Sequence, residues 1–280
     1  MRVPVLIAAL FLIIFAAPAQ SAKLAKLKQA EVLGDTLLNQ QDFAGALKQY
    51  NKVAKGTKLK DAPSRQILYK RAVCYFYLGE FDNALADLDV FIPENPNTPR
   101  ARILRAFIYR EMDNPEGQLA DLDEILQWDT NNLDVMKWRA GVLVELERNR
   151  EAITQLQSVR IWGSDEEVEL YLGIAYYGLN ESDSALVHFN EAISINGGYL
   201  PAYMYAGSLL LEGGSYDQAL LYLDLANRLE PGNMQVVFYK GVALVELNRK
   251  DEGCRLLNRA FYSGIDDAAG YLQEHCFIKE

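Results

Sequence analysis

The sequence contains few residues of the kinds that build metal and redox centres. Its 280 residues include two histidines and three cysteines, too few for a zinc finger or a multi-haem protein. Basic residues are outnumbered, with 28 Lys and Arg against 38 Asp and Glu and a net charge of −10. A nucleic-acid binder needs clustered positive charge, so this balance argues against that class. We find no Ser/His/Asp order, Gly-rich phosphate loop or H-E-x-x-H helix, and nothing argues for catalysis or a cofactor.

Long hydrophobic runs are also scarce, and the longest lies at the N-terminus. Met1-Arg2 is followed by an apolar run from Val3 to Ala17, which ends in Ala17-Pro18-Ala19. The run is shorter than the roughly twenty residues that span a bilayer. One positive charge, a short apolar stretch and small residues before the cleavage position are typical of a secretory signal peptide. We therefore expect residues 1–19 to be a signal peptide, with an uncleaved membrane anchor as the alternative, and no integral membrane span after cleavage.

The rest of the chain repeats with a period of 34 residues. Seven positions combine an Ala, or an equivalent residue, with a large apolar residue four positions later, and their spacings are 38, 34, 34, 33, 34 and 34. A small residue lies twelve positions before each of them. Within each unit, apolar residues recur at intervals of three and four, which is the pattern of amphipathic helices. The seven positions are Ala46, Ala84, Gln118, Ala152, Ala185, Ala219 and Gly253.

One unit shows most clearly which family the repeat resembles. The run Tyr171-Leu172-Gly173-Ile174-Ala175-Tyr176, followed by Ala185, Phe189 and Ala192, is similar to the tetratricopeptide repeat. Four units depart from the family pattern by having Arg or Lys where Leu is usual. These residues are Arg71, Arg105, Arg139 and Lys240.

The resemblance implies an all-α fold, a right-handed α-solenoid of about seven helix-turn-helix repeats with a C-terminal capping helix. We expect the solenoid to cover residues 20–265 and the capping helix to cover residues 266–280. The repeats are expected near residues 27–60, 65–98, 99–132, 133–165, 166–199, 200–233 and 234–265.

The cysteines and histidines are few enough to interpret individually. Cys254 is expected near the start of the last repeat's second helix and Cys276 at the end of the closing helix. Neighbouring antiparallel helices place such ends side by side, and export favours a disulfide. The surrounding residues also resemble the C-terminal cap of some exported bacterial repeat proteins. Two independent buried thiols are the alternative, and a metal site with His275 lacks a fourth ligand. We interpret Cys74 as a small core residue, and we expect His188 to face solvent or a neighbouring repeat.

Two of the arginines that replace Leu have an acidic residue at a fixed distance. Asp87 and Asp121 lie sixteen residues after Arg71 and Arg105, at positions expected on the partner helix of the same repeat. We therefore predict an Arg–Asp ion pair within each of these repeats, with a ligand site as the alternative. The pattern weakens in the fourth repeat, where Gln155 stands in place of the Asp.

The resemblance also implies a concave groove, lined by the first helices, in which the family binds partners. Family members that clamp a terminal carboxylate use Lys and Asn at the fifth and ninth positions, whereas here Lys137 is followed by Gly141. An extended or helical segment with apolar anchors therefore fits better. For many groove positions, packing between helices is the alternative. The expected groove residues are Tyr69, Val73, Phe76, Tyr77, Ile103, Phe107, Arg110, Lys137, Leu170, Ile174, Tyr177, Met204, Leu211 and Phe238.

Four glutamates recur at the thirteenth position of the repeat, near the end of the first helix. A carboxylate there opposes the helix dipole. An acidic rail along the groove would favour a partner with Lys or Arg beside its apolar anchors. Local ion pairs, such as Glu145 with Arg148, are the alternative explanation. The predicted acidic rail consists of Glu111, Glu145, Glu212 and Glu246.

These observations predict a non-catalytic protein–protein interaction scaffold that holds a peptide or protein segment in its groove. One alternative is an architectural subunit of a cell-envelope assembly. Copies of the chain could then associate with one another. A further alternative is an unrecognised enzyme or carrier. We expect no cofactor, metal or nucleic acid. The signal segment predicts export, to the periplasm of a Gram-negative bacterium or otherwise as a secreted protein.

Overall fold

The computed structural model describes residues 4–56 and 62–276, with side chains from residue 21 onward except those of residues 57–65. In these ranges every regular element is a helix, and no strand is present. The prediction of an all-α repeat fold is therefore confirmed. The predictions that fall on residues 1–3, 57–61 and 277–280, at the signal, the end of the first repeat and the cap, lie outside the described residues.

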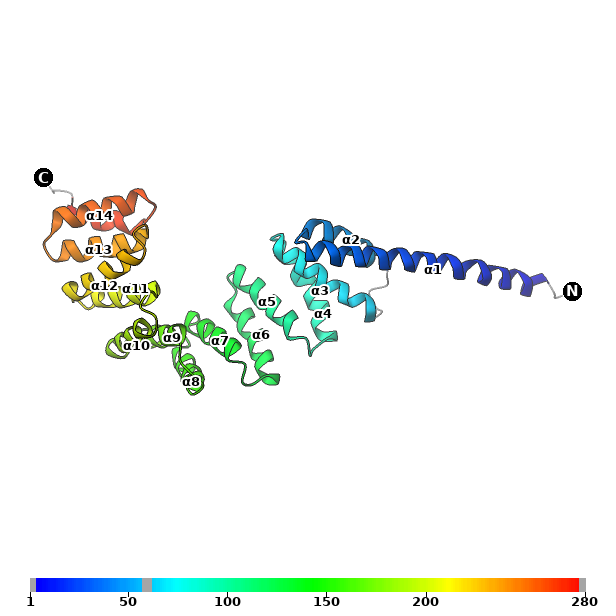
Figure 1. The fold of residues 1–280 in the computed structure, drawn as a ribbon, viewed down its shortest axis with the longest axis horizontal. Coiled ribbons are helices and arrows are strands. Elements are labelled where there is room, and N and C mark those ends of the chain that lie inside the picture. The colour runs from blue at the N-terminus through cyan, green and yellow to red at the C-terminus, as the bar shows by residue number, and fades with distance from the viewer. Residues whose placement is uncertain (1–3, 57–61, 277–280) are drawn as a thin grey trace. The chain divides into compact units, whose positions relative to one another are not determined.

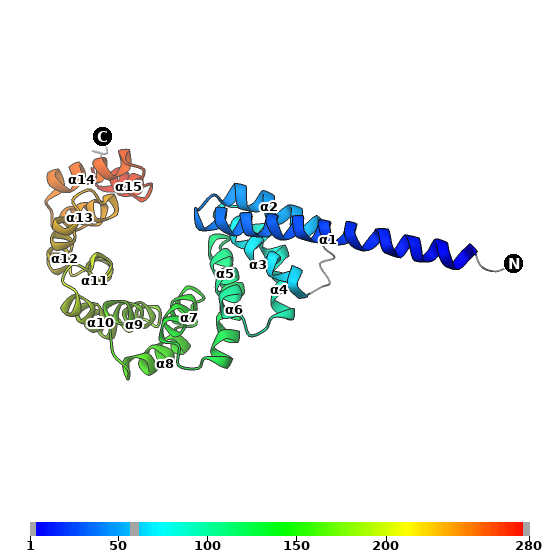
Figure 2. The same cartoon turned by 45° about the vertical axis from the view of Figure 1, so that its right-hand side comes forward.

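The helices follow one another as antiparallel pairs, which gather into two units, residues 1–130 and 131–280. The first unit contains α1 (Pro4–Asn39), α2 (Phe43–Gly56), α3 (Ala62–Tyr77), α4 (Phe81–Glu94), α5 (Pro99–Glu111) and α6 (Pro115–Trp128) (Figure 1). The second contains α7 (Leu133–Glu145), α8 (Asn149–Arg160), α9 (Glu166–Gly178), α10 (Ser182–Ile195), α11 (Leu200–Glu212), α12 (Tyr216–Leu229), α13 (Met234–Glu246), α14 (Lys250–Tyr262), α15 (Asp267–Tyr271) and the π-helical turn η1 (Leu272–Cys276) (Figure 2).

Each turn between the two helices of a pair contains one residue in the left-handed backbone region. Gly79 and Gly214 adopt this conformation with φ of 73° and 71°, as glycine readily does. Non-glycine residues adopt it in the other pairs, for example Asp113 and Asn180 with φ of 53° and 61°. A left-handed residue after the last turn of a helix ends it and reverses the chain. The recurrence of this residue explains why the first helix of each pair ends at the same point of the repeat.

The two helices of a pair approach closely where a small residue faces a large one. A Cβ added to Gly173 on α9 would lie 2.4 Å from Cε1 of Phe189 on α10, and one added to Gly207 would lie 2.8 Å from Cγ of Leu223. Phe189 and Leu223 are 1 % and 0 % exposed, so the large residues form the centre of each pair. The small residues at this position therefore set the spacing between the two helices.

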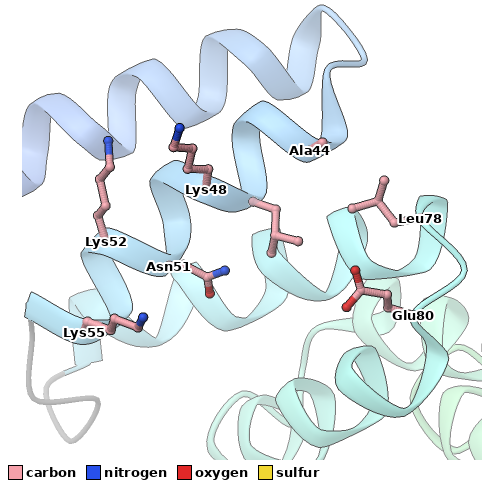
Figure 3. Close-up of a pocket in the computed structure, with 8 residues that line it drawn as sticks. Ala44, Lys48, Asn51, Lys52, Lys55, Leu78 and Glu80 are labelled. Carbon is pink, nitrogen blue, oxygen red and sulfur yellow. The ribbon is translucent and has the colours of Figure 1, made fainter.

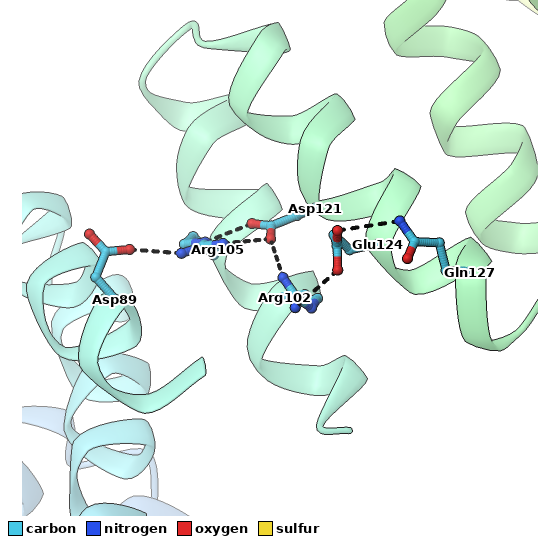
Figure 4. A network of polar contacts seen from close by, with 6 residues as sticks. All are labelled: Asp89, Arg102, Arg105, Asp121, Glu124 and Gln127. Atoms are coloured by element: carbon cyan, nitrogen blue, oxygen red, sulfur yellow. Dashed lines mark hydrogen bonds and ion pairs between the residues drawn. The ribbon is translucent and has the colours of Figure 1, made fainter. Parts of the chain in front are cut away.

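Ion pairs replace part of this apolar packing in the first unit. Asp87 Oδ2 accepts a hydrogen bond from Arg71 Nε at 2.6 Å, and Asp121 Oδ2 accepts one from Arg105 Nε at 2.8 Å. Both predicted Arg–Asp pairs are thus confirmed. Arg105 also donates to Asp89 of the preceding repeat at 2.7 Å, which links α5 to α4 as well as to α6 (Figure 4).

A buried carboxylate ties three neighbouring elements together in the second unit. Glu169 on α9 is fully buried, and it accepts hydrogen bonds from Ser164 at 2.5 Å and from Arg160 Nε at 2.9 Å. Its other oxygen lies 2.7 Å from Nδ1 of His188 on α10. The prediction that His188 faces solvent or a neighbouring repeat is wrong, because the imidazole turns inward to Glu169 and stacks on Tyr176 of the same pair.

The C-terminal segment covers the last helix pair. Leu272 and Ala268 are buried against α13 and α14, and the Tyr271 ring meets Phe238 edge-on at 6.3 Å between centroids. Cys254 and Cys276 are disulfide-bonded, with sulfur atoms 2.00 Å apart, so the end of η1 is fastened to α14. Because these sulfurs are bonded to each other, they do not form the metal site considered with His275. Cys74 is a free thiol in the core.

Two kinds of feature are absent from the described residues. No helix in this part of the chain is long and apolar enough to span a membrane. No group of three or more His, Cys, Asp or Glu side chains there is placed to hold a metal ion.

The Arg–Asp pairs provide a test of how much a buried charge contributes to stability. Asp121 is 1 % exposed and accepts hydrogen bonds from Arg105 and Arg102. We expect Asp121→Asn to lower the free energy of unfolding by about 3 kcal/mol, because both guanidinium groups lose a buried anion. Asp89, whose side chain is 59 % exposed, is the control, and Asp89→Asn should cost less than about 1 kcal/mol. Urea unfolding followed by circular dichroism checks this, and equal losses in the two variants would contradict it.

Candidate functional site

In the second unit the first helices of successive pairs contact one another. α7 contacts α9, α9 contacts α11, and α11 contacts α13. These four helices therefore form a continuous layer within residues 131–280. Residues at the same repeat position on neighbouring helices of this layer are expected to lie side by side, because each pair stacks on the next in a similar way.

Large aromatic residues occupy one such position on all four helices. Trp138, Tyr171, Tyr205 and Tyr239 are 33, 34 and 34 residues apart, on α7, α9, α11 and α13. Tyr171 extends over Gly141 of α7, since a Cβ there would lie 3.0 Å from Cζ of Tyr171. Tyr205 stacks on Phe189 with 5.6 Å between ring centroids and remains 41 % exposed. We call these four residues the aromatic stripe.

Tyr171 and Tyr205 lie within electrostatic reach of neighbouring groups in this layer. Burial raises the pKa of the Tyr171 hydroxyl, and nearby Glu167, Tyr205 and Glu145 raise it further. Burial also raises the pKa of Tyr205, with a contribution from Tyr239. The Tyr171 and Tyr205 hydroxyls are therefore protonated at neutral pH, and the carboxylates of Glu167 and Glu145 lie near that of Tyr171.

Glutamates of the predicted acidic rail lie near tyrosine hydroxyls. Tyr177 on α9 donates a hydrogen bond to Glu212 on α11 at 2.5 Å. This bond, together with burial, raises the pKa of Tyr177 to about 12. Tyr271 of the cap makes a similar contact with Glu246, where burial and the carboxylate raise the pKa of its hydroxyl. Glu212 and Glu246 thus each lie beside a tyrosine of a neighbouring element.

Glu145, which lies near the Tyr171 hydroxyl, and Glu111 are the other two members of the predicted rail. Glu145 is exposed at the end of α7, and Arg148 donates to Glu151 at 2.7 Å. Glu111, in the other unit, lies 3.4 Å from Arg110 of the same helix.

A surface pocket of about 580 Å³ lies beside the Tyr177–Glu212 contact. Leu186 and Leu209 provide apolar walls, and Asp183 adds a second carboxylate to that of Glu212. The pocket is formed by the turns of two neighbouring helix pairs, at the end of the layer of first helices. Its chemistry suits a side chain that combines an aliphatic stem with a positive charge.

The predicted groove residues of the C-terminal unit fall into three groups. Tyr177 is 37 % exposed and accessible. Ile174, Met204 and Leu211 are half-buried and pack against the apolar cores of their helix pairs. The assignment of Leu170 and Phe238 to the groove is wrong, because at 6 % and 7 % exposure both side chains are core residues.

The positive charge of Lys137 is neutralised by two neighbouring carboxylates. Its ammonium group is 2.8 Å from Asp165 and 3.5 Å from Glu167. The hydrogen bond to Asp165 raises its pKa, against the effect of burial. A cation paired in this way is poorly suited to hold the carboxylate of a ligand.

The predicted groove residues of the N-terminal unit are mostly packing residues. Tyr69, Val73 and Phe76 are half-buried against the core of the α3–α4 pair, and Ile103 and Phe107 are half-buried on α5. Tyr77 is 61 % exposed and stacks on Phe43 at 4.2 Å between centroids. The Arg110 guanidinium lies over the Phe107 ring, 4.9 Å from its centroid.

Two features escaped the sequence analysis. The aromatic stripe occupies the repeat position directly after the fifth, and none of its four residues is among the expected groove residues. The 34-residue recurrence of Tyr171, Tyr205 and Tyr239 was a signal that could have revealed it. The buried Glu169 stands two residues before Tyr171, at a position where the family pattern has Trp, and that substitution was its only sequence signal.

Comparison with known proteins agrees with the repeat geometry. A family model described as tetratricopeptide repeat matches residues 32–99. A repeat protein of Methanocaldococcus jannaschii, called TPR repeat-containing, is 23 % identical over 216 residues, which are 69 % of this chain and 37 % of that protein. The chain spans about two fifths of the length of the curated relatives it matches.

Solved structures share the fold. A tetratricopeptide repeat protein from Parabacteroides merdae superposes with a TM-score of 0.72 at 13 % identity, over 89 % of this chain and 98 % of the other. The pilF protein of Pseudomonas aeruginosa superposes with a TM-score of 0.58 at 18 % identity, over 75 % of this chain and 97 % of the other. The chain therefore has the tetratricopeptide-repeat fold, and its residues 32–99 match the sequence model of that family. Proteins of this fold serve in general as scaffolds that bind protein or peptide partners.

The Tyr177–Glu212 hydrogen bond predicts an altered titration. The folded protein should hold Tyr177 protonated until about pH 12, because ionisation would place a phenolate beside Glu212. In Glu212→Gln we expect its pKa to fall toward the ordinary value of about 10. Any stability that this contact contributes is present below pH 10 and is lost as the pH rises toward 12. NMR titration of ring-labelled tyrosine measures this, and an unchanged pKa in Glu212→Gln would show that the bond is absent in solution.

Proposed function

We propose that the chain is a scaffold whose C-terminal unit binds a protein segment along the layer formed by α7, α9, α11 and α13. The aromatic stripe is the observation that carries the proposal. Tyrosine and tryptophan provide large, rigid contact area and polar atoms at low entropic cost, and they are enriched in binding surfaces. Four such residues on adjacent helices offer contacts at regular intervals to a segment lying across the layer.

The charges near the stripe favour a partner segment with Lys or Arg beside apolar residues. Glu145 and Glu212 lie at or beside the stripe and its pocket, and Lys137 is already paired with Asp165 and Glu167. A cation over an aromatic face and near a carboxylate gains from both contacts. A free terminal carboxylate meets no available cation here, so we propose an internal segment as the ligand.

We propose further that the protein acts after export. The N-terminal apolar segment has the layout of a signal peptide, and the Cys254–Cys276 bond is of the kind that persists in oxidising compartments.

Selection of peptides from a random display library against the purified protein tests the proposed site. We expect the enriched peptides to combine Lys or Arg with aromatic or aliphatic residues. The double variant Tyr205→Leu and Glu212→Gln should bind them at least tenfold more weakly, about 1.4 kcal/mol, because an aromatic anchor and a charge are lost.

The matched control changes the same residue types elsewhere in the C-terminal unit. Tyr262→Leu and Glu191→Gln alter an 84 % exposed tyrosine on α14 and an exposed glutamate on α10. This control should bind the selected peptides as the native protein does. Enrichment of acidic peptides, failure to enrich any peptide, or equal binding by both double variants would reject the proposed site.

A further inference from the structure

A second groove lies in the N-terminal unit, on the side of the second helices. It has a volume of about 580 Å³ and lies between α2 and the turn that joins α3 to α4 (Figure 3). Ala44, Leu47 and Leu78 form its apolar part, and Leu78 is 40 % exposed. Asn51 lies at its base, where it accepts a hydrogen bond from Arg71 at 3.1 Å.

Three lysines of α2 line this groove. Lys48, Lys52 and Lys55 are exposed and follow one another at intervals of four and three residues, which places them along one face of the helix (Figure 3). Lys52 Nζ donates to Gln49 at 3.0 Å. Among the described residues, no carboxylate lies within ion-pair distance of these three ammonium groups. The single acidic residue of the groove is Glu80, on the opposite wall.

Three other cations of the same unit are neutralised within the fold. Lys70 pairs with Glu31 and Asp35 at 3.0 and 2.8 Å, and Arg71 and Arg105 pair with buried aspartates. The lysines of α2 are therefore set apart from the cations that hold the repeats together.

The fold itself does not require positive charge at these positions. The equivalent residues of the second repeat, 38 positions further on, are Ala86, Val90 and Pro93.

The distribution of charge between the two units also favours an anionic ligand for this groove. Residues 1–130 contain 16 basic and 16 acidic residues, whereas residues 131–280 contain 12 and 22, so the net charge of −10 lies in the second unit. An anionic segment approaching the first unit meets no general repulsion there.

We propose that this lysine groove binds an acidic, amphipathic segment of a partner protein. Carboxylates spaced by three and four residues would face Lys48, Lys52 and Lys55, and an apolar side chain would lie on Leu47 and Leu78. The groove has no aromatic side chain on which bases stack, which disfavours single-stranded nucleic acid. Together with the proposed function of the C-terminal unit, the protein would connect two segments of opposite charge.

The test uses the full chain and two labelled peptides in fluorescence anisotropy. One peptide repeats Glu and Leu at helical spacing, and the other has Lys in place of every Glu. The acidic peptide should bind more tightly through the groove. The triple variant Lys48→Gln, Lys52→Gln and Lys55→Gln should weaken its binding about tenfold, as expected for the loss of three exposed ion pairs. The melting temperature should not change, because the three side chains are exposed.

The matched control removes three exposed cations from the last repeat. Lys250→Gln, Arg255→Gln and Arg259→Gln lie on α14, and the two arginines occupy the repeat positions of Lys48 and Lys52. This variant should bind the acidic peptide as the native protein does. Loss of binding in both triple variants would show non-specific attraction and overturn the proposal.

Three further results would also overturn it. Unchanged acidic-peptide affinity in the α2 variant would remove the lysines from the interaction. Single-stranded DNA or phosphatidylglycerol vesicles binding as tightly, with the same dependence on the lysines, would make the groove a general polyanion site. Sedimentation showing self-association that the α2 variant abolishes would make a second copy the occupant. None of these results depends on the aromatic stripe, whose selected peptides are tested separately.

Discussion

The two helices of each pair pack as they do because a small residue on the first helix faces a large residue on the second. A Cβ at Gly173 would meet the Phe189 ring, and Gly34 and Gly241 face Tyr50 and Leu257 in the same way. The two partners are sixteen residues apart in every case, so the close approach also fixes the register between the helices. Stacking of these pairs brings equal repeat positions onto one face. The aromatic stripe and the α2 lysines both depend on that geometry.

Charges enter this framework in two different ways. Buried ones, such as Asp121 and Glu169, are satisfied by several donors and connect neighbouring helices. Some exposed charges line the two proposed binding surfaces, and their sign differs between these surfaces. Acidic groups accompany the tyrosines of the C-terminal unit, whereas three lysines line the groove on α2. This separation of charge underlies the two binding surfaces that we propose.

The periodicity of the sequence predicted the fold well, because close helix packing demands small and large residues at fixed spacing. The same spacing predicted the Arg71–Asp87 and Arg105–Asp121 pairs. The site was harder to predict, since apolar residues on a first helix serve packing and binding alike. Phe238 was assigned to the groove and lies in the core. His188 turns inward to Glu169, a buried charge in a packing position, and the replacement of the family's Trp by Glu169 did not by itself show that this carboxylate is buried.

The central claim is that the stripe on the first helices of the C-terminal unit is the partner-binding surface. NMR of the protein with labelled tyrosine rings, titrated with a display-selected basic and apolar peptide, tests this most directly. We predict that the ring signals of Tyr171, Tyr205 and Tyr239 shift together and saturate with one affinity. Shifts confined to tyrosines away from the stripe, such as Tyr109 or Tyr262, with these three rings unchanged, would contradict the account.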